Sequence, residues 1–371
     1  MSISPSVTHL TAAFAVAAIA WMPAHAAAQN AGTVNRGVVE LETGPAEDLS
    51  VQMAGNIASI IDDGATRRVV PVVGKGPLQN LIDLKYLRGV DLAIVQADAL
   101  NYAREQNLLP GIGALTYIAK LYDEEFHLLA RPDIKAVSDL AGQAVNVDVR
   151  GSGTAVTATR LFDLLNVKVK MTTDNQAVAL QKLRQGEIAA IAFVAAKPAP
   201  LFEGLKSNES LHLLNIPLTQ AVAASYAPTK ITAADYPGLV AADHPIDTIA
   251  IGNVLMAADL RTIPDRYNNL SNFIDRFFTG FQGLLEPGHD PKWREVNVAA
   301  DISGLTRHPA AAQWLQSNQQ VAAAPSPDAM KQLFSRFIDE RRQSSGGAPM
   351  SPVEKNALFQ QFETWRRGQA Q

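Results

Sequence analysis

Residues 145–154 read VNVDVRGSGT, a β-branched run that enters a turn of small residues. The segment at 155–165 follows directly, and its apolar residues Val156, Leu161, Leu164 and Leu165 recur at nearly helical spacing. A strand, a glycine turn and a helix in this order form the building unit of a sheet that helices cover. The stretch therefore predicts an α/β fold.

Further strand-like runs extend this pattern along the chain. They alternate with amphipathic helical segments such as 48–62 and occupy 37–42, 68–73, 91–96 and 188–194. The run at 125–130 leads out of the first α/β unit, and a late strand at 247–256 follows the second. We expect the late strand to return to the first unit, so that two connections join two lobes in a hinge arrangement.

The composition excludes several classes of protein. The 371 residues are 47% hydrophobic and 18% charged, with a net charge of -4 and no cysteine. A disordered chain, a disulfide scaffold and a cysteine-built metal site are therefore excluded. The mildly acidic balance leaves no basic footprint for nucleic acid, so we expect no nucleic-acid partner.

The first residues resemble an export signal. The run LTAAFAVAAIAWMPAHAAA at 10–28 is short, apolar and ends in small residues, although no Lys or Arg precedes it. It predicts a signal peptide at 1–28 and a periplasmic location, with a membrane anchor as the alternative. No later stretch has 18 consecutive apolar residues, so we expect no membrane span in the mature protein. A C-terminal helical extension is expected at 325–371.

The turn at 150–155 is suited to hold an anion. Its backbone N–H groups lie at a positive helix start beside the hydroxyls of Ser152 and Thr154, and Arg150 supplies a cation. The alternative is an N-cap and a tight turn that bind nothing. A dinucleotide site is a weaker match, because Val156 stands where the third glycine belongs. Lys75, in a second glycine turn, either meets an anionic ligand or is a solvated loop lysine.

Templates for catalysis do not fit the sequence. It contains no G-x-S-x-G, no H-E-x-x-H and no thiol. His127 lies in an apolar run, where we interpret it as a satisfied core or cleft residue. The pair Glu47 and Asp48 is expected to cap a helix or face the cleft. We therefore expect no catalytic residues, no metal ligands and no cofactor. Had the chain been an enzyme, His127 and Glu125 would be its candidate bases.

The order of motifs resembles the TAXI family, the solute-binding subunits of TRAP transporters within the type II periplasmic binding proteins. The resemblance is carried by VDLAIVQADAL (90–100), AKLYDEEFHLLAR (119–131), SDLAGQAVNVDVRGSGT (138–154), LRQGEIAAIAFVAAKP (183–198), YAPTKI (226–231) and DTIAIGNVLMA (247–257). It implies two lobes, each a mostly parallel sheet with helices on both faces. We expect lobe I at 34–135 and 226–320, and lobe II at 136–225.

The resemblance also implies a pocket between the lobes, beyond the carboxyl ends of the strands. Transferred to this sequence, the ligand-binding residues are Gly44, Pro45, Lys75, Gly76, Gln96, Ala97, Asp98, Arg150, Ser152, Gly153, Thr154, Ala155, Phe193, Val194 and Lys197.

The expected function is that of a solute receptor. It would capture a small carboxylate, such as a dicarboxylate, keto acid or amino acid, and deliver it to TRAP-type permease subunits. A ligand-sensing domain that reports to a membrane partner is the alternative, and an enzyme on the same fold is a further one. The first loop reads TGPAED at 43–48, whereas the family usually has a glycine-rich loop with tyrosines, so ligand identity does not transfer.

Overall fold

The structure is a computed structural model that describes residues 37–205 and 211–318. The predicted signal peptide at 1–28 and helical extension at 325–371 lie outside the described residues. The strands are β1 (Val38–Thr43), β2 (Arg68–Val73), β3 (Leu92–Gln96), β4 (Thr116–Ala130), β5 (Ala144–Asn146), β6 (Lys170–Thr172), β7 (Ala190–Ala195), β8 (His212–Leu213), β9 (Ala227–Ile231) and β10 (Ile246–Ala257). The helices are α1 (Leu49–Ile61), α2 (Pro77–Tyr86), α3 (Ala97–Glu105), α4 (Gly153–Leu164), α5 (Gln176–Arg184), α6 (Pro200–Glu203), α7 (Gln220–Ser225), α8 (Pro264–Gly280) and α9 (Pro309–Ser317).

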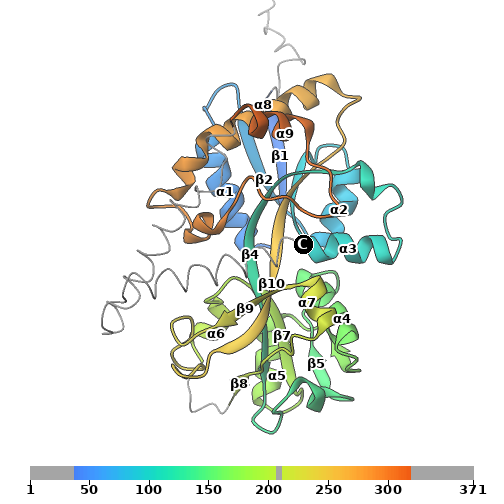
Figure 1. Ribbon diagram of the computed structural model, residues 1–371, viewed down its shortest axis with the longest axis vertical. Helices are drawn as coiled ribbons and strands as arrows, with labels where there is room; N and C mark the ends of the chain where they lie inside the picture. Colours follow the sequence, from blue (N-terminus) through green and yellow to red (C-terminus); the bar gives the residue numbers. More distant parts are fainter. Residues whose placement is uncertain (1–36, 206–210, 319–371) are drawn as a thin grey trace, which may run out of the picture. The chain divides into compact units, whose positions relative to one another are not determined.

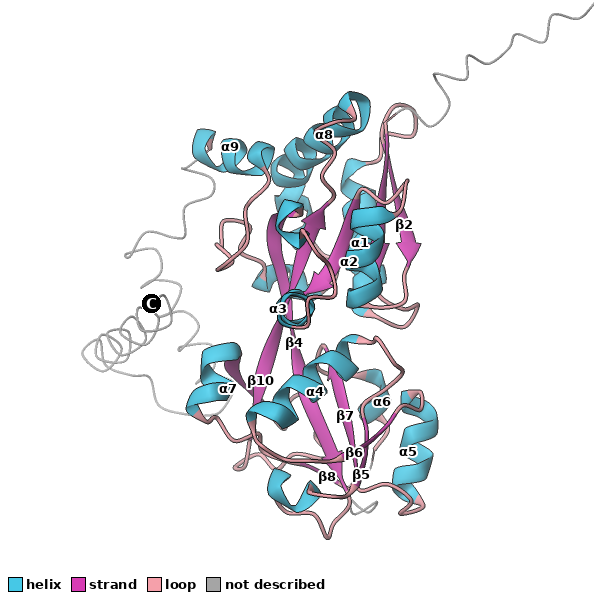
Figure 2. Cartoon of the chain, turned by 90° about the vertical axis from the view of Figure 1, so that its right-hand side faces the viewer, coloured by secondary structure: helices cyan, strands magenta, loops and turns pink. Residues whose placement is uncertain are grey.

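The expected α/β fold with two lobes is confirmed. The strands follow the order β2-β1-β3-β10-β4-β7-β5-β6, with β8 beside β4 and β9 beside β10. Figures 1 and 2 show β4 and β10 running side by side through both lobes. The first half of β4 pairs with the end of β10, and its second half pairs with β7. β4 and β10 thus connect the two lobes.

The sheet is mixed, which corrects the expectation of mostly parallel sheets. The strands joined through helices are parallel: β1 with β2 and β3, and β5 with β6 and β7. The antiparallel pairs involve β4 or β10, which pair with each other and with β3, β7, β8 and β9. The reason is that β10 returns toward lobe I against the direction of β4.

Helices cover both faces of the sheet in lobe II. Along β7, Ala190, Ala192 and Val194 pack with α4, while Ile191 packs on the other side with α5 and α6. Successive side chains of a strand point to opposite faces, so this alternation fixes the register of β7. The expectation of helices on both faces is confirmed for this lobe. The exact lobe boundaries stay a prediction.

A single apolar core fills lobe I. It joins β1, β3 and the upper halves of β4 and β10 to α1, α8 and α9. Trp293, Phe273 and Phe277 are large buried side chains on the α8 side, and the ring centroid of Phe277 lies 6.2 Å from that of Phe273 and 6.4 Å from that of Trp293. No helix among the described residues is long and apolar enough to span a membrane.

Candidate functional site

The two lobes touch where the strands of each lobe end. Gly76, before α2, lies against the turn before α4, and a Cβ on Gly76 would lie 2.6 Å from the Gly151 carbonyl oxygen. Gly76 also has a φ of 128°, a backbone angle that residues with a side chain rarely adopt. A Cβ on Gly153 would lie 1.8 Å from Gln96 Oε1. Only glycine permits this approach, so the glycines of both predicted turns define the contact.

Two cations flank this contact, one from each lobe. Lys75 precedes Gly76, and Arg150 precedes Gly151. Both side chains are exposed, and neither forms an ion pair with another described residue. The structure thus brings together two predicted site residues from different lobes. That an anion between the lobes meets both charges stays a prediction.

The predicted anion turn uses its own hydroxyls. Ser152 is the N-cap of α4, and its Oγ accepts a hydrogen bond from Ala155 N at 3.1 Å. Thr154 Oγ1 accepts one from Val194 N at 3.0 Å, and both hydroxyl residues are buried. Ser152 therefore has the N-cap geometry that the alternative interpretation described. Whether the turn also binds an anion stays a prediction.

A carboxylate of the chain itself lies beside this turn. Asp148 has a φ of 68°, and burial raises the pKa of its carboxyl, while bonds from Val149 and Ser152 oppose the rise. The charge of Glu47, from the other lobe, adds to the rise. The start of α4 is thus partly neutralised already, and an incoming anion would need the cations Lys75 and Arg150 nearby.

A buried polar cluster lies under the contact, in lobe I. Glu124 Oε2 accepts hydrogen bonds from Gln96 Nε2 and from Asn253 Nδ2, each at 3.0 Å. Asn253 faces Gln96 across the β10–β3 ladder, and a register shift after Gly252 reorients this part of β10. Burial raises the pKa of Glu124 to about 8, and the charge of Asp48 adds to the rise. The environment of the cluster therefore favours the neutral form of this carboxyl.

Two further groups in the cluster lack partners. The Tyr122 hydroxyl and Gln96 Oε1 are buried, and neither forms a hydrogen bond with another described residue. Burial raises the pKa of Tyr122, with the charges of Glu124 and Asp48 as further causes. Among the described residues, no group of three or more His, Asp or Glu side chains is arranged to hold a metal ion. The cluster offers hydrogen bonds rather than metal ligands.

The first loop supports α1 as well as the cluster. Asp48 caps α1, because its Oδ1 accepts from Ser50 N at 2.7 Å. Gly44 is buried and donates its N–H to Ser50 Oγ at 2.7 Å, while Pro45 accepts from Asp48 N through its carbonyl oxygen. The expected capping role of Asp48 is confirmed. Its charge also reaches Glu124, so it belongs to the lobe I side of the site.

Asp98 holds the two lobes together. Its Oδ2 accepts hydrogen bonds from Thr157 Oγ1 of α4 at 2.7 Å and from the Tyr226 hydroxyl at 3.0 Å. Burial raises the pKa of Asp98, and these two bonds oppose the rise. Asp98 thus joins α3, to which it belongs, to α4. Ala97 and Ala155, the partly buried neighbours at the two helix starts, pack against their own cores.

The structure does not bring together the three predicted site residues of β7 and of the loop that follows it. Val194 lies on the α4 side and donates to Thr154, whereas Phe193 points to the opposite face and packs its ring against Phe202. Lys197 Nζ lies 3.8 Å from both Glu125 and Asp235. The structure therefore places Val194 beside the turn at α4, and it places Phe193 and Lys197 elsewhere.

The two candidate bases have structural partners. His127 is fully buried, with Nδ1 2.9 Å from the Glu125 carbonyl oxygen and Nε2 2.8 Å from the Tyr236 hydroxyl. Burial lowers the pKa of His127 to about 4. Glu125 Oε1 pairs with Lys292 at 3.4 Å. His127 is a satisfied core residue, as expected, and neither group is free to take a proton from a substrate.

The residues that the sequence reasoning missed are Glu124, Asn253, Tyr122 and Tyr226. All four are buried, and they come from strand positions or strand ends that meet at the centre of the molecule. One signal was present: Glu124 and Glu125 form an acidic pair inside the apolar run that becomes β4. Charged residues are rarely buried without a partner, so such a pair marks a polar cluster.

Several solved structures are similar to most of the chain. The alkanesulfonate-binding protein SsuA from Xanthomonas axonopodis pv. citri is 14% identical, with 82% of this chain and 93% of that chain covered and a TM-score of 0.41. The periplasmic binding protein BugD is 14% identical, with coverages of 77% and 95% and a TM-score of 0.43. A TctC solute binding protein from Polaromonas is 15% identical, with coverages of 70% and 86% and a TM-score of 0.39.

The sequence comparison is more direct, because a family match spans more than half of the chain. The matched residues are 41–262, which run from β1 through β10 and include every predicted site residue. The chain belongs to the NMT1-like family.

Proposed function

We propose that the chain is an extracytoplasmic solute receptor that captures a small organic anion between its lobes. The observation that carries the proposal is the pair of unpartnered cations, Lys75 and Arg150, on opposite sides of the glycine contact. A ligand that touches both cations binds the closed arrangement more tightly than an open one. Binding then shifts the population toward closure, which a transporter can recognise.

The buried cluster supplies the neutral part of the site. Burial raises the pKa of Glu124 to about 8, which favours its neutral form, and Gln96 Oε1 has no partner among the described residues. A matching ligand would have a carboxylate at one end and an uncharged hydrogen-bonding group at the other. The carboxylate would meet Lys75 and Arg150, and the uncharged end would meet the polar cluster around Glu124. Micromolar affinity corresponds to about -8 kcal/mol, which a few charge-assisted hydrogen bonds and some apolar burial can supply.

We extend the proposal to the transporter partner and to the location of the protein. Membership of the NMT1-like family over 41–262 supports a binding role. The motif resemblance to TAXI proteins supports a TRAP-type permease as the partner, and the signal-like run at 10–28 supports export to the periplasm. Under this proposal the chain has no catalytic role. His127 then serves the core of lobe II, and Glu125 serves its ion pair with Lys292.

A ligand panel with charge variants tests the proposal. Dicarboxylates, keto acids and amino acids are screened by thermal stabilisation, and a hit is titrated by calorimetry. Saturation at 100 times Kd adds about 2.7 kcal/mol to the unfolding free energy. Lys75→Gln and Arg150→Gln should each weaken binding about tenfold or more, because each removes a charge-assisted contact. Lys170→Gln, at an exposed position of β6, is the matched control and should bind normally.

Two results would contradict the proposal. In the first, no carboxylate stabilises the chain. In the second, the hit binds equally well to Lys75→Gln, Arg150→Gln and the native chain. If the chain instead converted a hit to a product and released it, this would favour the enzyme alternative.

A further inference from the structure

A second concave site lies in lobe I, away from the contact between the lobes. It is a cavity of about 280 Å³ between α8 and the loop that leads into β2. Its lining includes Gly37 at the start of β1, whereas the contact between the lobes follows the end of β1 at Gly44. Six strand residues span about 20 Å, so the cavity and the proposed ligand site lie at opposite ends of this strand.

One face of α8 presents polar groups to this cavity. Asn269, Asn272 and Arg276 all line it, and their spacing of three and four residues places them on one helix face. None of these three side chains forms a hydrogen bond or ion pair with another described residue. Phe273, which is buried, forms the apolar part of the same face. The helix thus contributes one free cation and two free amides, and the exposed carboxylate of Asp275 also lines the cavity beside Arg276.

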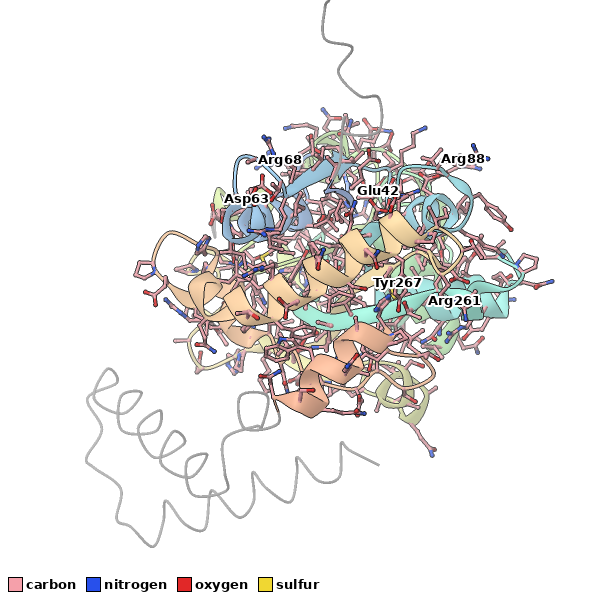
Figure 3. All side chains as sticks on the ribbon, turned by 90° about the horizontal axis from the view of Figure 1, so that it is seen from above. Glu42, Asp63, Arg68, Arg88, Arg261 and Tyr267 are labelled. Atoms are coloured by element: carbon pink, nitrogen blue, oxygen red, sulfur yellow. The ribbon has the colours of Figure 1, made fainter. Side chains whose placement is uncertain are left out.

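The opposite wall is the loop before β2, with Arg67 at its end and Arg68 as the first residue of β2. Asp63 fixes this loop by accepting hydrogen bonds from the N–H groups of Ala65, Thr66 and Arg67 at 2.7 to 3.0 Å. Arg67 and Arg68 line the cavity and pair with Asp63 and Asp62 at 3.1 and 3.3 Å. Figure 3 shows Arg68 and Asp63 on the same side of the molecule.

Several hydrogen-bond donors at this cavity have no partner among the described residues. Arg67 Nε is buried and has no partner among the described residues. Together with the unpartnered guanidinium of Arg276 and the two amides, it makes the cavity rich in free donors. Free N–H donors and cations around a small hollow match the oxygen atoms of an anion.

We propose that this cavity binds a small soluble oxyanion, such as a phosphate group, between Arg276 of α8 and Arg67 of the loop. The site is separate from the proposed solute site, because it lies at the other end of β1 and shares no residue with it. Planar guanidinium groups bind phosphate oxygens in pairs, and the two amides can complete the coordination.

Inorganic phosphate is the probe for the test. The full chain is titrated with phosphate at pH 8 by calorimetry, with sodium chloride at matched ionic strength as the reference. Arg276→Gln should weaken phosphate binding about tenfold or more, because one charged donor group is lost. Asn272→Ala should weaken it severalfold without changing the net charge. Both positions are exposed on α8, so the fold should be retained, and circular dichroism checks this.

Arg88→Gln is the matched control. Arg88 is also an exposed arginine of lobe I and has no partner among the described residues, but it does not line the cavity. Figure 3 shows it on the other side of the view from Arg68. Arg88→Gln and Lys75→Gln should bind phosphate as the native chain does.

Three results would overturn the proposal. Phosphate binding by Arg276→Gln that equals native binding would remove Arg276 from the site. An equal loss in Arg88→Gln would show an unspecific charge effect. A loss in Lys75→Gln but not in Arg276→Gln would assign phosphate to the contact between the lobes, which would leave the proposed function intact and remove this second site.

Discussion

Glu124→Gln is predicted to stabilise the folded chain at alkaline pH and to change its stability little at pH 5. Glu124 is 3% exposed, and burial raises its pKa from 4.5 to about 8, with the charge of Asp48 adding to the rise. In the unfolded chain the carboxyl regains its ordinary pKa. The folded chain therefore holds an extra proton between pH 4.5 and 8, and the stability that it gives is lost as pH rises through 8.

The size of the effect follows from the two pKa values. A rise from 4.5 to about 8 corresponds to about 5 kcal/mol of unfolding free energy lost across this range. Asp48 interacts with Glu124, so the two carboxyls titrate as a pair and the loss is spread over a wider range of pH. Glutamine keeps an oxygen that can accept from Gln96 and Asn253, each 3.0 Å from Glu124 in the native chain. The substitution therefore removes the charge and keeps the hydrogen bonds.

Urea denaturation at a series of pH values from 5 to 9 measures the effect. The stability difference between Glu124→Gln and the native chain should grow with pH by several kcal/mol and level off above pH 8. Glu187→Gln, at an exposed position before β7, is the control and should follow the native chain at every pH. A stability difference for Glu124→Gln that is constant with pH would refute the reasoning, because it would mean that Glu124 ionises normally in the folded chain.

Two other predictions concern packing and acid stability. Gly153→Ala should lower the unfolding free energy by about 1 to 3 kcal/mol, because its Cβ would lie 1.8 Å from Gln96 Oε1 and would push this side chain off its partner Glu124. Gly55→Ala, in α1 with no atom within 4 Å of the new Cβ, should instead stabilise by about 0.5 to 1 kcal/mol; equal effects of the two alanines in thermal denaturation would argue against the contact. Burial lowers the pKa of His308 from 6.5 to about 4, so stability present above pH 6.5 is lost as pH falls through 4. His308→Asn keeps an N-cap acceptor for α9 and should flatten the acid limb of the stability curve; an unchanged limb would contradict the assigned pKa.

The local pattern of the sequence was enough to predict most strands. The run at 68–73 became β2 with the same bounds, and the late strand at 247–256 became the greater part of β10. Only the second half of β4 was predicted. Its first half carries Lys120, Asp123 and Glu124, which interrupt the alternation of apolar and polar residues that identifies a strand. Lys120 and Asp123 pair with each other within β4, whereas Glu124 is held by Gln96 of β3 and Asn253 of β10, which a local pattern does not contain.

The candidate site was predicted in part for the same reason. The glycine turns at Gly76 and Gly153 were identified from their local sequence, but their meeting depends on the placement of two lobes. The hydroxyls of Ser152 and Thr154 were expected to face a ligand, yet each has a backbone partner. The partner of Ser152 is local and gives the N-cap that the sequence offered as the alternative, whereas Val194 N reaches Thr154 only in the folded chain. Glu124 escaped notice because its burial arises from strands that are distant in sequence.

Distance measurement between the lobes tests the central claim most directly. The chain has no cysteine, so spin labels can be attached at Arg88→Cys in lobe I and Lys170→Cys in lobe II, both exposed. Electron resonance then gives the distance distribution with and without the carboxylate that stabilises the chain most. The account predicts a broad distribution without ligand and a single shorter distance with saturating ligand. An identical distribution in both conditions, with binding confirmed by calorimetry, would contradict capture between the lobes.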